Sequence, residues 1–347
     1  MAIFTEERMS RPIFSQAMAA CRRWLADEGI EVNRLPSAGF SGASAWDVRH
    51  GSRGFVLKNF VASASRGHAE WVHSLMRHVR AAGHRQVPEV FSGVDGSTVQ
   101  ADPGGTLWEL LERMPGSPTD RPTLAQAAAA GELLARLHRA AATVPGEMGK
   151  HGIPASLQRR ITGGRDLLAR PWTMRDPDAA PPGIRPRFTR AAEILATAAG
   201  RQALAAMASA TAAPCVLQPV LRDVWSDHLL FDASRLVGVI DWHAAGIDTP
   251  ATDIARLLGS WPDDLRITGA VLEGYAAISP LAPEWLALIP FLRASGIVLG
   301  LDNWFRWTME EGRRFADMSM VEHRIDALLA TLPAAIDMLA SRAVYRG

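Results

Sequence analysis

The chain has 347 residues, which is enough for two lobes that each bury a core of their own. Its 48% of hydrophobic residues is typical of a soluble globular protein. The formal charge of +1 excludes a strong overall field that would attract nucleic acid or a membrane, so we expect a small molecule as the partner. Two cysteines, Cys21 and Cys215, are too few for a disulfide framework, and the N-terminal stretch lacks a signal-peptide core. We therefore expect a cytoplasmic protein.

The first part of the chain changes between helical and strand periodicity. Apolar residues at helical spacing predict a helix over residues 6–28, which ends at Gly29. A second helix is predicted over residues 66–82, where apolar residues recur every four positions. Short apolar runs between turn residues predict strands at Ile30–Val32, Trp46–Val48, Phe55–Phe60, Val87–Val94, Thr98–Ala101 and Thr106–Glu112.

The pattern breaks at Met114-Pro-Gly-Ser-Pro118, where we place the boundary between an N-terminal lobe (residues 1–113) and a C-terminal lobe (residues 114–347). The second lobe is mainly helical. Helices are predicted over Leu124–Ala141, over Ala191–Thr211 and from Ile254 onward, with a loop over Pro171–Pro186 and breaks at prolines 262, 280, 283, 290 and 333. The apolar stretches Trp285–Leu292 and Ala294–Leu301 are broken by Pro290, Arg293 and Asp302, well short of the roughly 20 residues of a membrane span.

A hairpin flanked by carboxylates lies within the second lobe. Apolar runs at residues 229–231 and 236–240 predict two strands joined by a turn at residues 232–235. Asp223 precedes the hairpin and Asp241 stands where it ends. Two carboxylates are thus placed at the ends of one rigid element.

The order of these elements, together with Leu221-Arg222-Asp223, His228 and Ile240-Asp241-Trp242, resembles the small-molecule branch of the protein-kinase-like fold. This branch is the aminoglycoside phosphotransferase and choline kinase-like family. The resemblance implies an α+β fold with a small antiparallel-sheet lobe for ATP and a large helical lobe for the acceptor. It also implies an ATP- and Mg²⁺-dependent kinase that phosphorylates a hydroxyl of an aminoglycoside, an amino alcohol or a sugar.

The chemistry of phosphoryl transfer suits these residues. A carboxylate must orient the attacking hydroxyl and accept its proton, a role that the resemblance gives to Asp223. A hard oxygen ligand must hold the metal that neutralises the phosphates, a role that it gives to Asp241. No Asp-Phe-Gly or Ala-Pro-Glu segment follows the hairpin, which argues against a protein kinase proper.

His228 departs from the family pattern, because the family has Asn at this position. Mg²⁺ binds imidazole poorly, so His228 is a candidate catalytic and metal-binding residue with several alternatives. His228 donates to phosphate or to Asp223, or neighbouring Asp227 reaches the metal, or the enzyme uses Mn²⁺. If the second metal is instead lost, the chain is a nucleotide-binding pseudokinase that acts as a regulatory or interaction module.

The ATP-binding residues follow from the same resemblance. Lys58, in the strand Gly54–Phe60, is similar to the lysine that holds the α- and β-phosphates, with Glu70 on the next helix as its implied partner. Residues 109–114 resemble the strand and hinge that bind adenine through backbone groups. In the loop after the first strand, Gly39 and Gly42 would let the backbone approach phosphate, and Ser41 would donate a hydrogen bond.

Further residues have two interpretations each. Asp253 either supports the catalytic loop, as the family's Asp-Leu-Ala motif implies, or caps a helix. Helix capping is also one interpretation of Asp248. His138 is interpreted as structural. Trp225 lies in the catalytic loop and is expected to face the acceptor. An acidic and aromatic patch of Asp302, Trp304, Trp307, Glu310 and Glu311 either binds the acceptor or is the solvated face of a helix.

Overall fold

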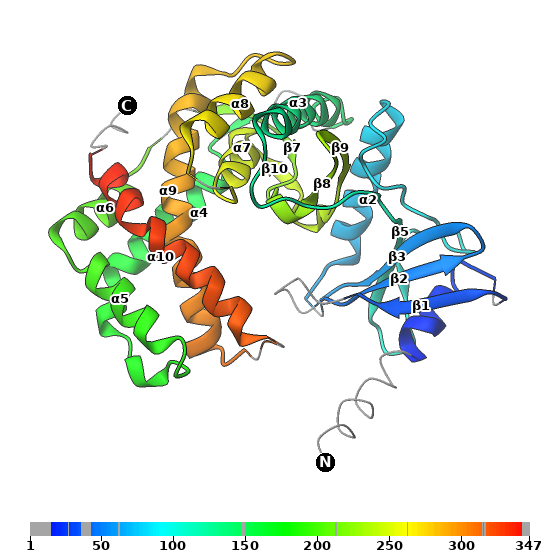
Figure 1. Cartoon of the computed structure of the whole chain (residues 1–347), viewed down its shortest axis with the longest axis horizontal. Coiled ribbons are helices and arrows are strands. Elements are labelled where there is room, and N and C mark those ends of the chain that lie inside the picture. Colours follow the sequence, from blue (N-terminus) through cyan, green and yellow to red (C-terminus); the bar gives the residue numbers. More distant parts are fainter. Residues whose placement is uncertain are drawn as a thin grey trace. The chain divides into compact units, whose positions relative to one another are not determined.

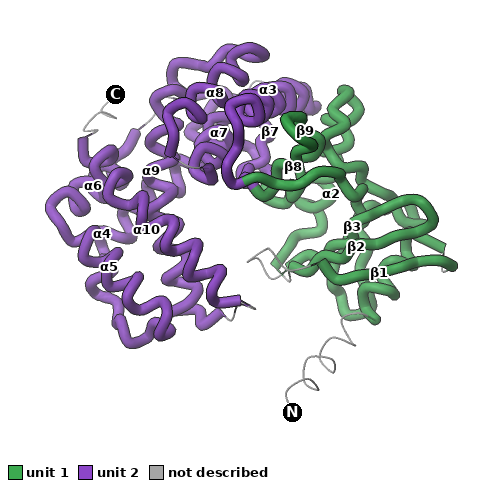
Figure 2. Tube along the Cα trace, in the orientation of Figure 1, with its two compact units in different colours: residues 1–119, 227–244 green, residues 120–226, 245–347 purple. Residues whose placement is uncertain are grey.

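The computed structural model describes residues 15–26, 28–35, 43–61, 63–146, 150–211, 214–261, 263–313, 315 and 317–341. The chain forms two compact units, shown in Figure 2. Unit 1 comprises residues 1–119 and 227–244, and unit 2 comprises residues 120–226 and 245–347. This division differs from the single predicted boundary after residue 113, because the hairpin of the C-terminal half groups with the first unit.

Unit 1 is built on a five-stranded antiparallel sheet with the order β1-β2-β3-β5-β4. Figure 1 shows β1, β2, β3 and β5 side by side. One face of the sheet packs Trp46, Phe55 and Trp108 against the helical residues 15–21. The strands and the helix α2 of this unit are β1 (Ile30–Arg34), β2 (Ala45–His50), β3 (Arg53–Asn59), α2 (Arg66–Ala81), β4 (Gln100–Ala101) and β5 (Leu107–Glu112).

Most of the predicted elements of unit 1 are confirmed, with two corrections. The predicted helix over residues 6–28 is helical only over 15–21 among the described residues. The predicted strand Val87–Val94 is wrong, since Val90 forms only an isolated bridge to Leu111. Pro88 lacks the N–H that a strand pairing would use, which explains why the ladder does not extend.

The predicted hairpin is confirmed as β8 (Leu229–Asp232) and β9 (Arg235–Val239). It joins unit 1 through backbone hydrogen bonds. The Ser117 and Phe231 peptide groups exchange N–H···O bonds of 3.0 and 2.8 Å, and the Val239 N–H donates to the Gln86 carbonyl at 2.8 Å. These bonds hold the end of β9, where Asp241 follows, against the strand-rich unit.

Unit 2 is mainly helical and carries a small three-stranded sheet with the order β10-β7-β6. α3 packs so closely on α8 that an added Cβ at Gly131 would lie 2.0 Å from the Val271 carbonyl oxygen. The elements are α3 (Leu124–Ala141), β6 (Lys150–Gly152), α4 (Ala155–Ala169), α5 (Arg185–Leu195), α6 (Ala198–Ala208), β7 (Cys215–Val220), β10 (Gly246–Asp248), α7 (Ala251–Leu258), α8 (Leu265–Ala276), α9 (Pro283–Phe305) and α10 (Met318–Ser341).

The helix boundaries of unit 2 correct several expectations. The predicted helix Ala191–Thr211 is two helices, because Thr197 caps the start of α6 by accepting the Gly200 N–H. The predicted loop Pro171–Pro186 contains two short 3₁₀ turns and the start of α5. Pro290 and Pro333 do not end helices but lie inside α9 and α10, so packing outweighs the roughly 3 kcal/mol that an internal proline costs.

Because α9 continues through Pro290, the predicted interruption of its apolar run is wrong. Among the described residues one helical stretch, Pro283–Glu310, is long and apolar enough to cross a membrane by length and composition. Several of its apolar residues, including Phe291, Leu292, Val298 and Leu301, are buried in the protein. α9 lies against α10, α7 and α4, as a core helix of a helical lobe does, so its length alone is weak evidence for a membrane span.

Candidate active site

Lys58 and Asp241 form the charged centre of unit 1. Lys58 Nζ, on β3, donates a 2.6 Å hydrogen bond to Asp241 Oδ1, just after β9. Asp241 has φ of 61°, a left-handed conformation that non-glycine residues seldom adopt and that clusters at functional sites. Two of the residues predicted to handle phosphate and metal are thus brought together across 183 positions of sequence.

Positive and imidazole groups surround the Asp241 carboxylate. His228 Nε2 lies 3.7 Å from Oδ2, and His243 Nδ1 lies 4.0 Å from Oδ1. Partial burial would raise the pKa of the Asp241 carboxyl, but the charges of Lys58 and His228 and the Lys58 hydrogen bond lower this pKa below its ordinary value. Asp241 is therefore held as a carboxylate, the form that a cation requires.

The implied pairing of Lys58 with Glu70 is wrong in this structure. Glu70 is half-exposed on α2 and forms an i,i+4 ion pair with Arg66 at 3.5 Å. Lys58 instead pairs with Asp241, which lies closer because the end of β9 is bonded into unit 1. The predicted phosphate-loop residues Gly39, Ser41 and Gly42 lie outside the described residues.

A buried carboxylate that the sequence reasoning missed links α2 to the segment after β9. Glu109 on β5 is fully buried and accepts a 2.7 Å hydrogen bond from His73 Nε2 of α2. Its other oxygen, Oε1, lies 2.7 Å from His243 Nε2. His73 Nδ1 in turn contacts Thr98 Oγ1 at 2.8 Å, and the Phe60 ring stacks on His243 with centroids 4.5 Å apart.

The electrostatics of Glu109 follow from these two imidazoles. Burial alone would raise the pKa of its carboxyl, but His243 and His73 together hold that pKa well below the usual range. One feature of the sequence indicates this site: Glu109 stands between Trp108 and Leu110 in a predicted strand. Because successive side chains of a strand point to opposite faces, the Glu109 carboxylate lies on the face opposite to Trp108 and Leu110. Residues 109–114 had been assigned only a backbone role.

In unit 2 the proposed base, Asp223, is engaged by an arginine. Arg256 on α7 donates from Nε and Nη2 to Asp223 Oδ1 at 3.0 and 2.9 Å. Both side chains are about one-third exposed, with relative exposures of 39% and 34%. Arg222, directly before the base, has φ of 65°, the same uncommon backbone conformation as Asp241. The sequence reasoning had not singled out Arg256.

Asp253 supports the catalytic loop, as the motif implied. Its buried carboxylate, in the first turn of α7, accepts the backbone N–H groups of Leu221 and Arg222 at 2.8 and 2.6 Å. His138 Nε2 lies 2.9 Å from the same carboxylate, and His138 Nδ1 lies 3.0 Å from the Tyr275 hydroxyl. Because Asp253 fixes the two residues before Asp223, it helps to determine where Asp223 stands.

Asp248 is buried and does not cap α7, but its carboxylate accepts an N–H of the first turn of α4. Its carboxylate accepts the backbone N–H and the hydroxyl of Ser156 at 2.9 and 2.8 Å, and the Thr249 N–H at 2.9 Å. Arg222 Nε lies 3.7 Å away, and Arg222 Nη2 donates to the Ile247 carbonyl at 2.6 Å. Asp248 thereby joins α4 and β10 to the residue next to the base.

Trp225, two residues after the base, lies between two guanidinium groups. Arg256 Cζ is 3.9 Å from the centroid of the Trp225 ring, and Arg324 Cζ on α10 is 5.3 Å from it. Both distances are within the range of cation–π attraction. The indole thus holds Arg256 beside Asp223.

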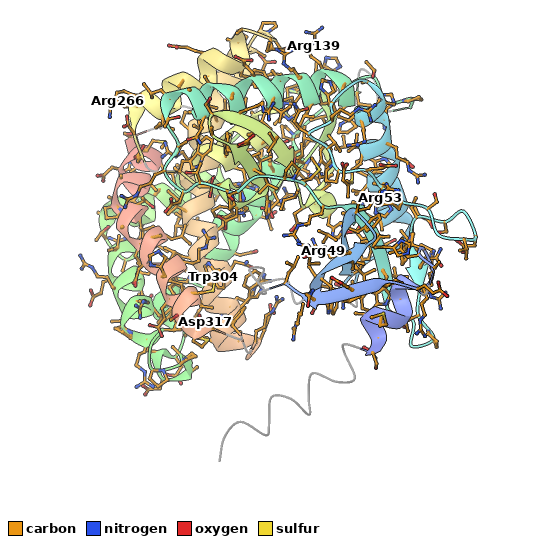
Figure 3. All side chains as sticks on the ribbon, turned by 45° about the vertical axis from the view of Figure 1, so that its right-hand side comes forward. Arg49, Arg53, Arg139, Arg266, Trp304 and Asp317 are labelled. Carbon is orange, nitrogen blue, oxygen red and sulfur yellow. The ribbon has the colours of Figure 1, made fainter. Side chains whose placement is uncertain are left out.

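The late acidic residues form ion pairs with the chain's own arginines. Asp302 accepts from Arg175 at 2.7 Å and from Trp172 at 2.8 Å, while Arg175 Nε lies 3.4 Å from Glu310. Trp304, labelled in Figure 3, packs edge-on against Trp307 with centroids 5.2 Å apart. Three further pairs are Glu311 with Arg313, Asp263 with Arg293 and Asp264 with Arg266.

The donor set of unit 1 fits one divalent ion only in part. Asp241 offers hard carboxylate oxygen, which suits Mg²⁺ when substrate phosphates and water complete the shell. Among the residues that the structure describes, no group of three or more His, Cys, Asp or Glu side chains could hold a metal ion by itself. The metal role of His228 therefore stays a prediction.

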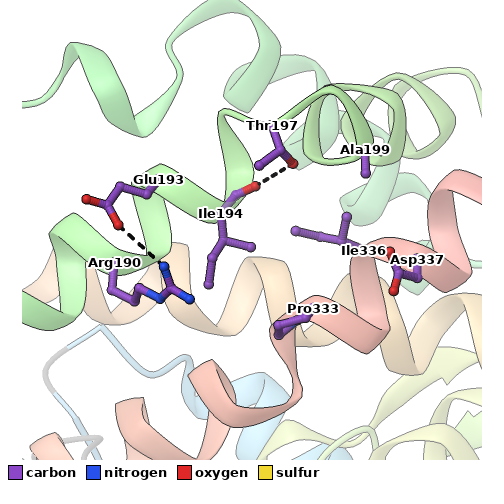
Figure 4. A pocket seen from close by; sticks show the side chains of 8 residues that line it. All are labelled: Arg190, Glu193, Ile194, Thr197, Ala199, Pro333, Ile336 and Asp337. Carbon is purple, nitrogen blue, oxygen red and sulfur yellow. Dashed lines mark hydrogen bonds and ion pairs between the residues drawn. The ribbon is translucent and has the colours of Figure 1, made fainter.

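A separate surface groove lies between α5, α6 and α10 (Figure 4). The ion pair of Arg190 with Glu193 spans 3.5 Å at its edge. No residue expected to act in phosphoryl transfer lines it, so the groove does not belong to the candidate active site.

Comparison with known proteins gives consistent results. Residues 33–289 match the phosphotransferase enzyme family (APH). The homoserine kinase of Acidiphilium cryptum (strain JF-5) is 26% identical over 324 residues, covering 88% of this chain and 89% of that protein. The homoserine kinase of Brucella anthropi is 26% identical over 267 residues, covering 74% of each.

Among solved structures, a spectinomycin phosphotransferase in complex with ADP and spectinomycin aligns with a TM-score of 0.70 at 11% identity, covering 94% of this chain and 97% of that one. A microcompartment-associated aminopropanol kinase aligns with a TM-score of 0.62 at 16% identity, covering 94% and 98%. These likenesses show the predicted kinase-like fold. With the family match over most of its length, the chain belongs to the phosphotransferase enzyme family and is an ATP-dependent small-molecule kinase.

Proposed function

We propose that this kinase phosphorylates the hydroxyl of a small amino alcohol of the size of homoserine, rather than a polycationic aminoglycoside. The observation that carries this proposal is the pairing of the late acids. A polycation needs several carboxylates that converge without partners of their own. Asp263, Asp264, Asp302, Glu310 and Glu311 each lie within ion-pair distance of an arginine of unit 2.

The relatives support the same size of acceptor. The two homoserine kinases cover most of the chain, and the aminopropanol kinase shares its fold. Homoserine and aminopropanol each carry a hydroxyl and an amine on a short carbon chain. A pocket for such a molecule requires few polar contacts, which suits a surface whose acids are already neutralised.

The residues of the two units have distinct roles in the proposed reaction. Asp223 accepts the proton of the attacking hydroxyl, whose oxygen forms a bond to the γ-phosphorus as the bond to the β-phosphate oxygen breaks. Lys58 turns from Asp241 to the phosphates of ATP when the nucleotide binds. The Asp253 carboxylate keeps the base in place through the Leu221 and Arg222 N–H groups.

Mg²⁺ is the proposed metal, with Asp241 as its protein ligand, and it would neutralise charge on the phosphates. Mn²⁺ is the alternative, because imidazole binds it more readily than Mg²⁺. His228, 3.7 Å from the Asp241 carboxylate, would donate a hydrogen bond to the phosphates. This arrangement requires no imidazole–magnesium bond.

The test is an ATP-consumption screen with homoserine, 3-amino-1-propanol, a sugar and an aminoglycoside, each with Mg²⁺ and with Mn²⁺. We expect turnover with the short amino alcohols. Asp223→Asn should lower kcat by at least about a hundredfold, since a general base contributes 10²–10⁴-fold, while ATP still binds in calorimetry. Asp232→Asn, in the exposed hairpin turn, is the matched control and should keep full activity. Turnover with the aminoglycoside alone, or full activity of Asp223→Asn, would refute the proposal.

A further inference from the structure

Arg256 occupies one oxygen of the Asp223 carboxylate, the group proposed as the base. Two N–H groups of one guanidinium point at a single carboxylate oxygen, Oδ1. Charge-assisted hydrogen bonds of this kind are about twice as strong as neutral ones, and they stabilise the charged carboxylate. The lone pairs of Oδ1 are thereby engaged, so a substrate hydroxyl does not donate to this oxygen while Arg256 holds it. Arg256 must therefore leave Oδ1 before that oxygen can accept a proton.

Arginine side chains dominate the surroundings of Arg256. Arg324 is the second arginine at the Trp225 ring, with its Cζ 5.3 Å from the ring centroid. Arg160 on α4 lies within the electrostatic range of both Arg159 and Arg256, and burial first, then these two charges, lower the pKa of Arg160 to about 10. Arg160 Nε has no hydrogen-bond partner among the described residues.

Two carboxylates form ion pairs with arginines of this cluster. Within the described part of unit 2, Asp223 is the ion-pair partner of Arg256, and Asp248 serves both Arg222 and Arg159 at 3.7 Å. An anion that enters beside Trp225 would meet the guanidinium groups of Arg256 and Arg324. Guanidinium groups present planar pairs of donors that match the two oxygens of a carboxylate.

We propose, on the basis of the function proposed above, that the acceptor carries a carboxylate and that this carboxylate docks on Arg256 beside Trp225. Its arrival draws the guanidinium from Asp223 and so makes the base available. Arg256 is then a binding residue that selects carboxylate-bearing acceptors and couples their binding to the base. The amine of the acceptor has no part in this coupling.

Three acceptors distinguish the contribution of the homoserine carboxylate from that of its amine. Homoserine carries both groups, 4-hydroxybutyrate lacks the amine, and 3-amino-1-propanol lacks the carboxylate. We expect the unaltered chain to prefer 4-hydroxybutyrate over 3-amino-1-propanol by at least about tenfold in kcat/KM, the size of one charge-assisted hydrogen bond. A preference for 3-amino-1-propanol would overturn the proposal.

Variants of Arg256 test the coupling. Arg256→Gln should raise KM for homoserine and 4-hydroxybutyrate by at least about tenfold, leave KM for ATP unchanged, and raise kcat for 3-amino-1-propanol. Arg256→Lys, which keeps the charge, should restore part of the affinity. Arg266→Gln, an exposed arginine on α8, is the control and should behave as the unaltered chain. Equal losses for all three acceptors in Arg256→Gln would show a merely structural role and overturn the proposal.

A binding measurement keeps the proposal testable if no acceptor is phosphorylated, an outcome that would refute the proposed function instead. The ADP-loaded chain is titrated calorimetrically with 4-hydroxybutyrate and with 3-amino-1-propanol. We expect binding of 4-hydroxybutyrate that Arg256→Gln removes. Binding of neither compound, or binding that Arg256→Gln leaves intact, would overturn the inference.

Discussion

Replacement of Glu109 by Gln tests the buried link between α2 and the segment that carries Asp241. Glu109 has 0% exposure and lies 2.7 Å from one nitrogen of His73 and 2.7 Å from one of His243. Gln has nearly the same shape but is neutral. The variant therefore removes the charge and leaves the packing of β5 in place.

The expected loss follows from these two contacts. The contact with His73 is a hydrogen bond to a charged group, worth about 1.5–3 kcal/mol, and Gln keeps part of it as a neutral bond. The contact with His243 is an electrostatic contact in a buried site, which Gln loses or reverses by presenting an N–H. We expect Glu109→Gln to lower the free energy of unfolding by about 2–4 kcal/mol.

The assay is urea unfolding followed by tryptophan fluorescence, because Trp46 and Trp108 are buried in the core of unit 1. Glu112→Gln is the control on the same strand. Glu112 is partly exposed and pairs with Arg80 at 2.9 Å, so its loss should be below about 1 kcal/mol. Equal effects of the two variants would refute the assignment of Glu109 as a buried charged hub.

The stabilisation that Glu109 provides should depend on pH, and the direction of this dependence follows from the pKa of its carboxyl. The pKa of Glu109 is lower in the folded chain than in the unfolded chain, where it is about 4.3. Its stabilising contribution is therefore complete above that value and is lost as the pH falls toward the folded-state pKa. The difference in unfolding free energy between the unaltered chain and Glu109→Gln should shrink below about pH 4. A difference that stays constant there would contradict the reasoning.

Three further predictions concern other parts of the chain. Gly131→Ala should destabilise unit 2 by about 3 kcal/mol, since its Cβ would meet the Val271 carbonyl oxygen at 2.0 Å, whereas Gly269→Ala on α8 meets nothing within 4 Å and should leave the melting temperature equal or higher. Burial raises the pKa of the Cys21 thiol to about 12, so alkylation of native protein near neutral pH should be slow and should become fast in urea; rapid native reaction would contradict this. Asp253→Ala should lower kcat at least about tenfold with little change in KM for ATP, measured by steady-state kinetics, because two loop N–H groups lose their acceptor.

The local pattern of residues was sufficient to predict the elements that position the site. Alternation and turn residues located β8 and β9, and helical spacing located α2 and α3. The same pattern placed Asp223 and Asp241 at the two ends of the hairpin, and the resemblance implied their roles. These features depend on short stretches of chain, where periodicity and turn chemistry act directly.

Pairings between distant residues could not be predicted in this way. Lys58 had Glu70 as its nearest acid on the following helix, yet it pairs with Asp241, 183 positions away. Likewise, the partner of Asp223 is Arg256, and the partner of Asp302 is Arg175. Which opposite charge a side chain meets depends on how separate elements pack, and sequence spacing does not contain that information.

The sequence by itself determined the fold class and, through its resemblance, the type of reaction, because hydrophobic periodicity and a few motif residues are local properties of the chain. The tertiary structure decided which charges meet. It buried Glu109 between two imidazoles, and it placed Arg256 against Asp223. The physical reason is that burial and Coulomb attraction depend on distance in space, and folding brings together residues that the sequence separates by more than thirty positions.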